Sequence, residues 1–416
     1  MEQGLHKNIT RIYLMGFFQN AMIVTAVFVP LMQRYGLSMS EVLQAQAWFA
    51  LVIALCEVPS GYLADCWGRK KTIQLGTLIC LMAFLWLINA DSFADFVAYE
   101  VLMALGISLN SGADLALLYD SQSWLNRNGK ANFHGDNSRH ITRLVSIESI
   151  AGGIAALLAS VLTLWSLDWV LWAQAFISLF AVWFALQLVE VPRALPPQSH
   201  RESVSQIKSA LVNNPVIWWT ALAIVAFSLS ALFAFWLYQK YWELQGIPLH
   251  WFGYLWACHC LLRAVAARYA CDIEQYLGPQ KVLILIALLP IIGFIGMGLL
   301  GGWLGLVFGL ALPLSRGLSL VVFYDALNNR LAADFRATMN SLVSLGTRGL
   351  FIVSGPALGL LVDYHGVQTS LLVLAAVFLP VFALVLIKLL NHIRQQQPAV
   401  QNDQCLPAGH QVDYEI

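Results

Sequence analysis

Long apolar stretches, separated by short polar turns, recur along the whole chain. A helix needs about 20 mostly apolar residues to cross the hydrocarbon core of a bilayer, and each stretch reaches roughly that length. The pattern predicts twelve membrane-spanning helices, at Ile9–Met32, Val42–Leu63, Thr72–Ala90, Phe93–Tyr119, Ile141–Leu164, Leu167–Val189, Pro215–Tyr238, Leu249–Cys271, Val282–Leu300, Gly302–Leu327, Ala337–Leu361 and Val367–Leu390.

Composition agrees with this all-α membrane protein. Hydrophobic residues make up 59% of the 416 residues and charged residues only 11%, whereas soluble domains carry roughly 25% charged residues. The formal net charge is zero, which indicates no nucleic-acid partner, so the positions of the charges carry the information. The bilayer is therefore the expected solvent of the chain.

The basic residues lie mainly on one side of the predicted spans. Of the 23 Lys and Arg, 18 fall in segments that face the cytoplasm if the amino terminus does, and 2 face outward, at Arg34 and Lys240. The other 3 lie within predicted helices. Cytoplasmic loops are enriched in Lys and Arg, so we expect a multi-pass protein of a bacterial inner (plasma) membrane with both termini cytoplasmic.

A central polar segment divides the chain. Residues 190–214 hold Pro192, Pro196 and Pro197 among polar residues, which is typical of a linker. Similar segments recur on either side of it: Leu118-Tyr119-Asp120 matches Phe323-Tyr324-Asp325 about one half-chain later. We predict two related six-helix bundles at 1–189 and 215–390, the linker at 190–214, and a disordered cytoplasmic tail at 391–416.

The loop between the second and third predicted helices carries a distinctive motif. It reads from Gly61 through Asp65 to Gly68, Arg69 and two lysines. This pattern resembles the signature loop of the major facilitator superfamily, and Arg268 to Gly278 form a degenerate second copy. The resemblance covers nearly the whole chain and implies twelve helices in two bundles related by a pseudo-two-fold axis. It also implies secondary transport by rocking of the bundles, with Gly61, Asp65, Gly68 and Arg69 acting as a gate.

Two departures from the patterns of proton-coupled exporters bear on the direction of transport. The fourth predicted helix lacks the arginine that many such exporters carry, and the fifth has Ala151-Gly152-Gly153 where antiporters have a Gly-Pro pair. A Gly355-Pro356 pair occurs only in the eleventh. The resemblance favours proton-coupled export of a small metabolite or drug, with an anion such as a siderophore as one example, while uptake of an organic anion by symport stays open.

Six charged residues stand out within the predicted spans. An ionised side chain at the bilayer centre costs about 2.5–3.5 kcal/mol on insertion scales, so such a residue normally faces a cavity or a partner. The first half holds acids and the second half holds bases. The acids are Glu57, Asp114 and Glu148, and the bases are Arg263, Arg316 and Arg348. We expect the bases to bind substrate and one of the acids to carry a coupling proton. The alternative is that these residues form interhelical ion pairs.

Other polar residues extend this expected site. Trp256 and His259 share a helical face with Arg263, and Asn20 lies deep in the first span. Asp120 and Asp325 lie near cytoplasmic helix ends, where we expect pairing with arginines and a role in gating. Cys258, His259 and Cys260 are adjacent, and adjacent helical side chains point about 100° apart, so they form no metal site.

The remaining functional classes find little support in the sequence. The sequence has no Gly-rich phosphate loop of the kind that ATP hydrolysis would need. It also has no cluster of nucleophile, base or metal ligands of the kind expected in an enzyme. A transporter-like receptor is a further alternative, but the polar tail is short for a signalling domain. We expect a monomer without a cofactor, whose partners are a small-molecule substrate, protons and the lipid bilayer.

Overall fold

The computed structural model describes residues 2–127, 137–191, 215–331 and 333–403, which form helices without any β-strand. The first group comprises α1 (Glu2–Asn20), η1 (Ile23–Val27), α2 (Phe28–Arg34), α3 (Met39–Trp67), α4 (Arg69–Leu87), α5 (Phe93–Asn110), α6 (Ala113–Arg127), α7 (Asn137–Leu162) and α8 (Leu167–Leu186). The second comprises α10 (Pro215–Leu244), η2 (Leu249–Trp251), α11 (Phe252–Arg268), α12 (Ala270–Leu277), α13 (Pro279–Leu299), α14 (Gly302–Gly309), α15 (Ala311–Asn328) and α16 (Ala333–Asp403).

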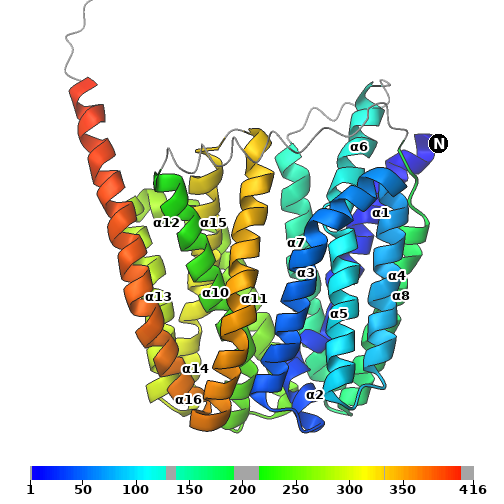
Figure 1. Cartoon of the computed structure of the whole chain (residues 1–416), viewed down its shortest axis with the longest axis horizontal. Coiled ribbons are helices and arrows are strands. Elements are labelled where there is room, and N and C mark those ends of the chain that lie inside the picture. Colours follow the sequence, from blue (N-terminus) through cyan, green and yellow to red (C-terminus); the bar gives the residue numbers. More distant parts are fainter. Residues whose placement is uncertain (1, 128–136, 192–214, 332, 404–416) are drawn as a thin grey trace, which may run out of the picture.

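These elements stand roughly parallel in two groups, α1 to α8 on one side and α10 to α16 on the other (Figure 1). Nine segments of the described chain are long and apolar enough to cross a membrane, and the last of them, Thr338–His392, is divided at Gly366. With α7 and α11 beside them, the arrangement is consistent with the twelve predicted spans. The helices contact across the two groups chiefly through α3 with α16 and α7 with α11.

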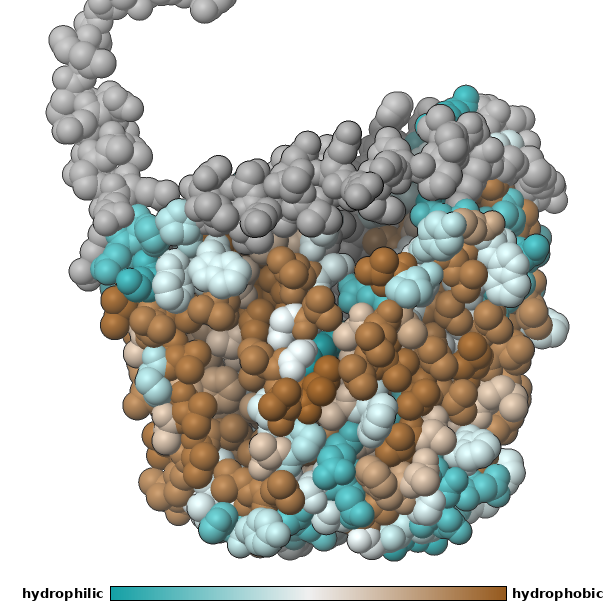
Figure 2. Space-filling view, viewed as in Figure 1, coloured by the Kyte–Doolittle hydropathy of each residue, from teal (hydrophilic) through white to brown (hydrophobic). Residues whose placement is uncertain are grey.

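The surface of the molecule matches a bilayer. Figure 2 shows a broad band of hydrophobic residues around the middle of the visible face, with hydrophilic residues gathered toward the two ends. Large apolar side chains such as Trp183, Leu186 and Leu299 are exposed. In water, so much exposed apolar surface would promote aggregation. The chain is a multi-pass membrane protein.

Two glycines mark equivalent helix boundaries in the two groups. Gly68 ends α3 and precedes α4 with φ +103°, and Gly278 ends α12 and precedes α13 with φ +83°. Positive φ is a conformation that glycine adopts at little cost. The second position lies in the degenerate copy of the loop motif, so the repeat expected from the sequence recurs in the backbone. We call the end that carries Arg69 and Lys70 the basic end, and the opposite end the far end.

The first membrane span is broken in its middle, and buried glutamines satisfy the broken backbone. The Gln174 side chain from α8 accepts hydrogen bonds from the N–H groups of Ile23 (2.5 Å) and Val24 (3.4 Å). Gln239 from α10 accepts from Val29 N–H (2.9 Å) and donates to the Thr25 carbonyl (2.8 Å). Non-helical backbone survives at membrane depth only where protein or trapped water pairs its polar groups, so these two side chains stabilise the break.

The structure differs from the sequence prediction at the carboxyl end. α16 continues as a helix through Asp403, whereas the sequence predicts a disordered tail from residue 391. The rest of that tail, 404–416, lies outside the described residues, as does the predicted linker from residue 192 to 214.

Close packing of α4 against α5 depends on two glycines. A Cβ added at Gly106 would lie 2.5 Å from Cys80 Sγ and 2.8 Å from the Gly76 carbonyl oxygen. We expect Gly106→Leu to destabilise the protein by about 1–3 kcal/mol, the usual effect of overpacking. Thermal unfolding in detergent measures this loss. The control is Gly349→Leu, where an added Cβ meets nothing within 4 Å; equal melting temperatures for the two variants would contradict the packing argument.

Candidate functional site

A cavity of about 490 Å³ lies between the two groups of helices. The first group lines it with the broken first span, α3, α4, α5 and α7, and the second group lines it with α10, α11, α15 and α16. At the broken span, Asn20, Met22, Val24 and Thr25 face the cavity. Interrupted helices are where membrane transport proteins often place substrate sites, because unwound backbone can line a cavity.

Three arginines from the second group line this cavity. They are Arg263 on α11, Arg316 on α15 and Arg348 on α16. Arg316 donates to Ser228 Oγ (2.8 Å) and the Nε of Arg348 donates to Ser344 Oγ (3.3 Å). Within the described part of the chain, none of the three forms an ion pair with a carboxylate. All three are charges that lie within predicted spans, and the fold brings them together on one cavity.

The carboxyl group of the described cavity lining belongs to Glu100, on α5. Glu100 is 4% exposed and Gln46 on α3 is 6% exposed. The Gln46 side-chain amide donates a short hydrogen bond to Glu100 Oε1. The sequence analysis did not select this pair, although Glu100 lies within a predicted span and the same rule of charges inside the membrane applies to it.

Aromatic and apolar side chains form most of the remaining lining. The buried Trp256 packs edge-on against Phe235, with ring centroids 4.6 Å apart. His259 packs edge-on against Tyr238 at 4.2 Å. The Asn20 amide donates to the Gly16 carbonyl at the end of α1 (2.9 Å) while the residue lines the cavity. Trp256, His259 and Asn20 therefore all lie where the sequence analysis expects them.

The three acids predicted to carry a proton lie outside this lining. Glu57 on α3 is half-buried and lies near Arg348 of the other group, close enough for their charges to attract. Asp114 is in the first turn of α6, and Glu148 on α7 is exposed and close enough to Asp114 for repulsion. None of the three forms an ion pair among the described residues.

The far end of the cavity is closed by contacts between the two groups. Asp363 of α16 accepts hydrogen bonds from the first two N–H groups of α3, those of Met39 (2.9 Å) and Ser40 (2.8 Å). A carboxylate is stabilised at a helix N-terminus by the unpaired N–H groups and the helix dipole. Gly359 packs directly on Ser40, leaving no room for a Cβ.

The other pair of contacting helices closes in the same way. On α7, Ser160 Oγ accepts from the Tyr254 N–H of α11 (2.9 Å), and Gly253 leaves no room for a Cβ against the Ala156 carbonyl. Figure 1 shows α3 and the first part of α16 close together at the lower end and apart at the upper end, where α6 and the amino terminus lie. This conformation is closed at the far end.

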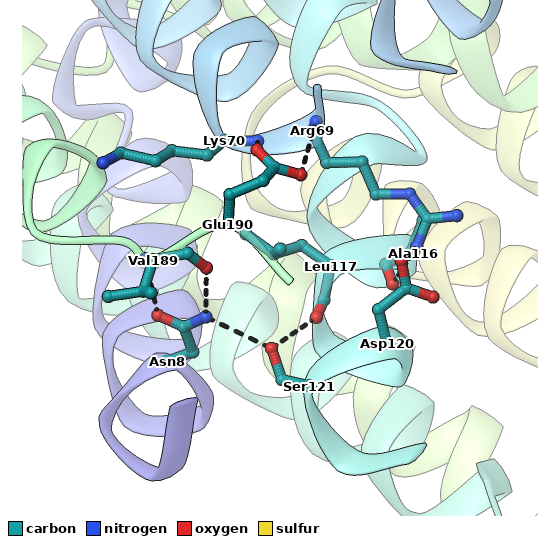
Figure 3. A network of polar contacts seen from close by, with 9 residues as sticks. All are labelled: Asn8, Arg69, Lys70, Ala116, Leu117, Asp120, Ser121, Val189 and Glu190. Carbon is teal, nitrogen blue, oxygen red and sulfur yellow. Dashed lines mark hydrogen bonds and ion pairs between the residues drawn. The ribbon is translucent and has the colours of Figure 1, made fainter. Parts of the chain in front are cut away.

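A polar network ties the loop motif to the rest of the first group (Figure 3). Glu190, just after α8, accepts from the N–H groups of Arg69 (3.1 Å) and Lys70 (2.8 Å) at the start of α4. Gly68 has a φ of +103°, which favours glycine, and an added Cβ would crowd Glu190 Oε2 at 3.0 Å. The Arg69 guanidinium forms an ion pair with Asp120 on α6 and donates to the Ala116 carbonyl.

The network continues to α1 through a buried asparagine. Asn8 donates to Ser121 Oγ (3.2 Å) and to the Val189 carbonyl (2.8 Å), and its own oxygen accepts from Val189 N–H (3.0 Å). Figure 3 shows these side chains converging from α1, α6 and the end of α8. The predicted gate residues Gly68, Arg69 and Asp120 thus belong to one network that stiffens the basic end of the first group.

The other expected gate residues are placed differently. Gly61 is exposed and an added Cβ would meet nothing within 4 Å, so no neighbouring helix packs closely on it in this conformation. Asp65 is exposed at the basic end of α3. Asp325 on α15 forms no ion pair with an arginine in the described regions, contrary to expectation, and lies near Glu274 instead. The pairing expectation is met at Asp120 alone.

The sequence also matches a known family. A family model described as the Major Facilitator Superfamily matches residues 11–335. Among curated proteins, no sequence matches the chain.

Solved structures of transport proteins share the fold. The nucleoside transporter NupG is 14% identical, with a TM-score of 0.69 over 92% of this chain and 99% of the other. A bacterial homologue of the human lysosomal transporter Spinster, inward-facing and unoccupied, is 16% identical, with a TM-score of 0.68 over 92% and 96%. A D-xylose-proton symporter is 10% identical, with a TM-score of 0.69 over 91% and 95%. At such identities the likeness concerns the fold.

The far-end closure makes a prediction about Asp363. Asp363→Ala removes the acceptor for two N–H groups of α3, and such charge-assisted bonds contribute about 1.5–3 kcal/mol when buried. Because Asp363 is exposed, we expect a smaller effect, a roughly threefold to tenfold faster amide hydrogen exchange at the start of α3. Hydrogen-exchange mass spectrometry measures it. Asp363→Asn keeps an acceptor oxygen and should change less; unchanged exchange in Asp363→Ala would contradict this role.

Proposed function

The chain belongs to the major facilitator superfamily, and we propose that it is a secondary active transporter that moves a small organic anion through the central cavity. The observation that carries this proposal is the set of three cavity-lining arginines, none of which forms an ion pair with a carboxylate in the described part of the chain, although Glu57 lies near Arg348. Arg316 and Arg348 are half-buried, and Arg263 is exposed. An ionised side chain within a membrane span normally faces a cavity or a partner, so an anionic substrate would pair with these guanidinium groups.

The chemistry of the lining narrows the substrate class. Arginine stays ionised at physiological pH and binds carboxylate or phosphate groups with two parallel hydrogen bonds. The volume of about 490 Å³ suits a metabolite-sized molecule. The aromatic side chains around Trp256 offer faces for an apolar or planar portion. We therefore propose an organic anion that carries an apolar part.

Electrostatics favours coupling of this anion to a proton in the same direction. A proton that neutralises an acid near the cavity removes a negative charge, so anion and proton strengthen one another's binding, and such coupling is reciprocal. This relation supports anion–proton symport, hence uptake. Export in exchange for protons is the second candidate, favoured by the loop that runs from Gly61 to Arg69. Both differ from an enzyme in that the substrate leaves unchanged.

Orientation follows from the charges. We propose that the basic end faces the cytoplasm, so that the conformation closed at the far end is inward-facing, in a bacterial inner membrane. In this proposal the network around Arg69 and Asp120 holds the first group rigid while the groups rock. Asp65, Gly61 and Asp325, at or near the basic end, would meet other groups when that end closes, and Arg69→Ala should then slow transport without changing substrate affinity.

A ligand screen tests the substrate class. Ligands that bind only the folded state raise the melting temperature by mass action. We expect one or more of acetate, succinate, benzoate and glucose 6-phosphate to raise the melting temperature of the purified protein. Arg316→Ala and Arg348→Ala should each weaken that anion's affinity by about tenfold or more, since a lost charged hydrogen bond costs about 1.5–3 kcal/mol.

The matched control is Arg330→Ala, an exposed arginine just beyond the end of α15 whose side chain donates to the Ala326 carbonyl. It should bind the anion as the natural protein does. Adenosine, D-xylose and choline serve as neutral and cationic probes. If these shift the melting temperature while no anion does, or if both cavity variants bind the anion unchanged, the proposal fails.

A further inference from the structure

We propose that Glu100, held by Gln46, is the group that binds the coupling proton of this transporter. The inference rests on the proposed function, because it names the second ligand site of the same cavity. The proton site is separate from the arginines that bind the anion. Glu100 and Gln46 lie on α5 and α3 of the first group, whereas the arginines lie on the second group.

The geometry around Glu100 is that of an isolated buried acid. Its side chain has one hydrogen-bond partner in the described chain, the Gln46 amide, and no ion pair. An ionised carboxylate in such a place has an effective desolvation penalty of several kcal/mol, while the neutral acid carries no comparable penalty. Glu100 should therefore be neutral while it is shielded from water, and ionised when water or a cation reaches it.

The surroundings contain no competing acid in the described lining. Tyr99 precedes Glu100 on α5, and Cys80 lies across on α4. His259, Tyr238 and the three arginines lie on the second group. On α3, the Glu41 carboxylate accepts hydrogen bonds from Ser38, the residue that caps this helix at the far end. Asp114, on α6, lies beyond the basic end of α5. Of these groups, Glu100 combines burial, access to the cavity and an acidic side chain.

In the neutral acid, the proton is bound to one particular carboxyl oxygen. Gln46 donates to Oε1, so the acidic hydrogen of neutral Glu100 resides on Oε2. Release breaks that O–H bond and transfers the proton to a water in the cavity, leaving a carboxylate that Gln46 still orients. No other bond changes and no oxidant or reductant is required. A carboxylate formed here adds negative charge to the cavity and weakens anion binding by the arginines, which couples the two ligands.

The same helix that closes the far end carries the donor to this acid. Ser40, whose N–H is bonded by Asp363, lies six residues before Gln46 on α3, or about 9 Å along the helix axis. Opening of the far end breaks the bonds between α3 and α16 and moves α3. The environment of Glu100 would then change with the side from which the cavity is open, as a coupled proton site requires.

Infrared difference spectroscopy tests the site without any substrate. In purified natural protein taken between acidic and basic pH, we expect a neutral-carboxyl C=O band that titrates and that Glu100→Gln removes. Glu57→Gln and Glu148→Gln should keep it. Gln46→Leu should retain the band but displace its midpoint and frequency, because the oriented hydrogen bond is lost. A band that persists in Glu100→Gln, or that one of the other two variants removes, would overturn the assignment.

Transport then tests coupling, with whichever of acetate, succinate, benzoate and glucose 6-phosphate binds as the labelled probe. In proteoliposomes, Glu100→Gln should exchange the probe within about threefold of the natural rate but lose accumulation driven by a pH gradient by tenfold or more. Retained pH-driven accumulation would overturn the proposal. If none of the four anions binds, the proposed function fails, and the infrared result still decides whether Glu100 titrates.

Discussion

The organisation of this molecule depends on one constraint, that backbone N–H and C=O groups inside a membrane have no water to bond. Straight helices meet it by themselves, but the first span is not straight. Between Asn20 and Phe28 the backbone leaves the α-helical pattern, and two buried glutamines, Gln174 and Gln239, bond its exposed groups. The broken segment can therefore line a cavity, because long-range side chains rather than water complete its hydrogen bonds.

Helix beginnings meet the same constraint with carboxylates. The start of α4 bonds to Glu190, and the start of α3 bonds to Asp363. The two differ in consequence: Glu190 belongs to the same group as α4 and stiffens it, whereas Asp363 belongs to the group opposite α3 and joins the two. Carboxylates at equivalent kinds of position therefore either brace one bundle or hold two bundles together, and only the second kind must break for the far end to open.

Charge is distributed so that neither group satisfies the cavity alone. The second group contributes three guanidinium groups and the first group contributes a carboxyl with its amide donor. Lipid-exposed positions around the band remain apolar (Figure 2), because an unpaired charge there would be costly. The charges that line the cavity in the described chain thus lie between the two groups, where relative movement can change their distances and their access to water.

The amino-acid sequence by itself predicted twelve apolar spans, a number with which the structure is consistent, because hydrophobic length is a local property. The sequence also pointed to Arg263, Arg316 and Arg348 as candidate binding residues, because a charge inside an apolar stretch can be seen in the sequence itself. Tertiary structure decided which of the acids within the predicted spans reaches the cavity. Glu100 does so, while Glu57, Asp114 and Glu148 lie outside its lining, because helix rotation and packing set which face of a span looks inward. It also decided that the first span breaks, since that break is stabilised by Gln174 and Gln239, more than a hundred residues away, and no local pattern specifies partners at such distance.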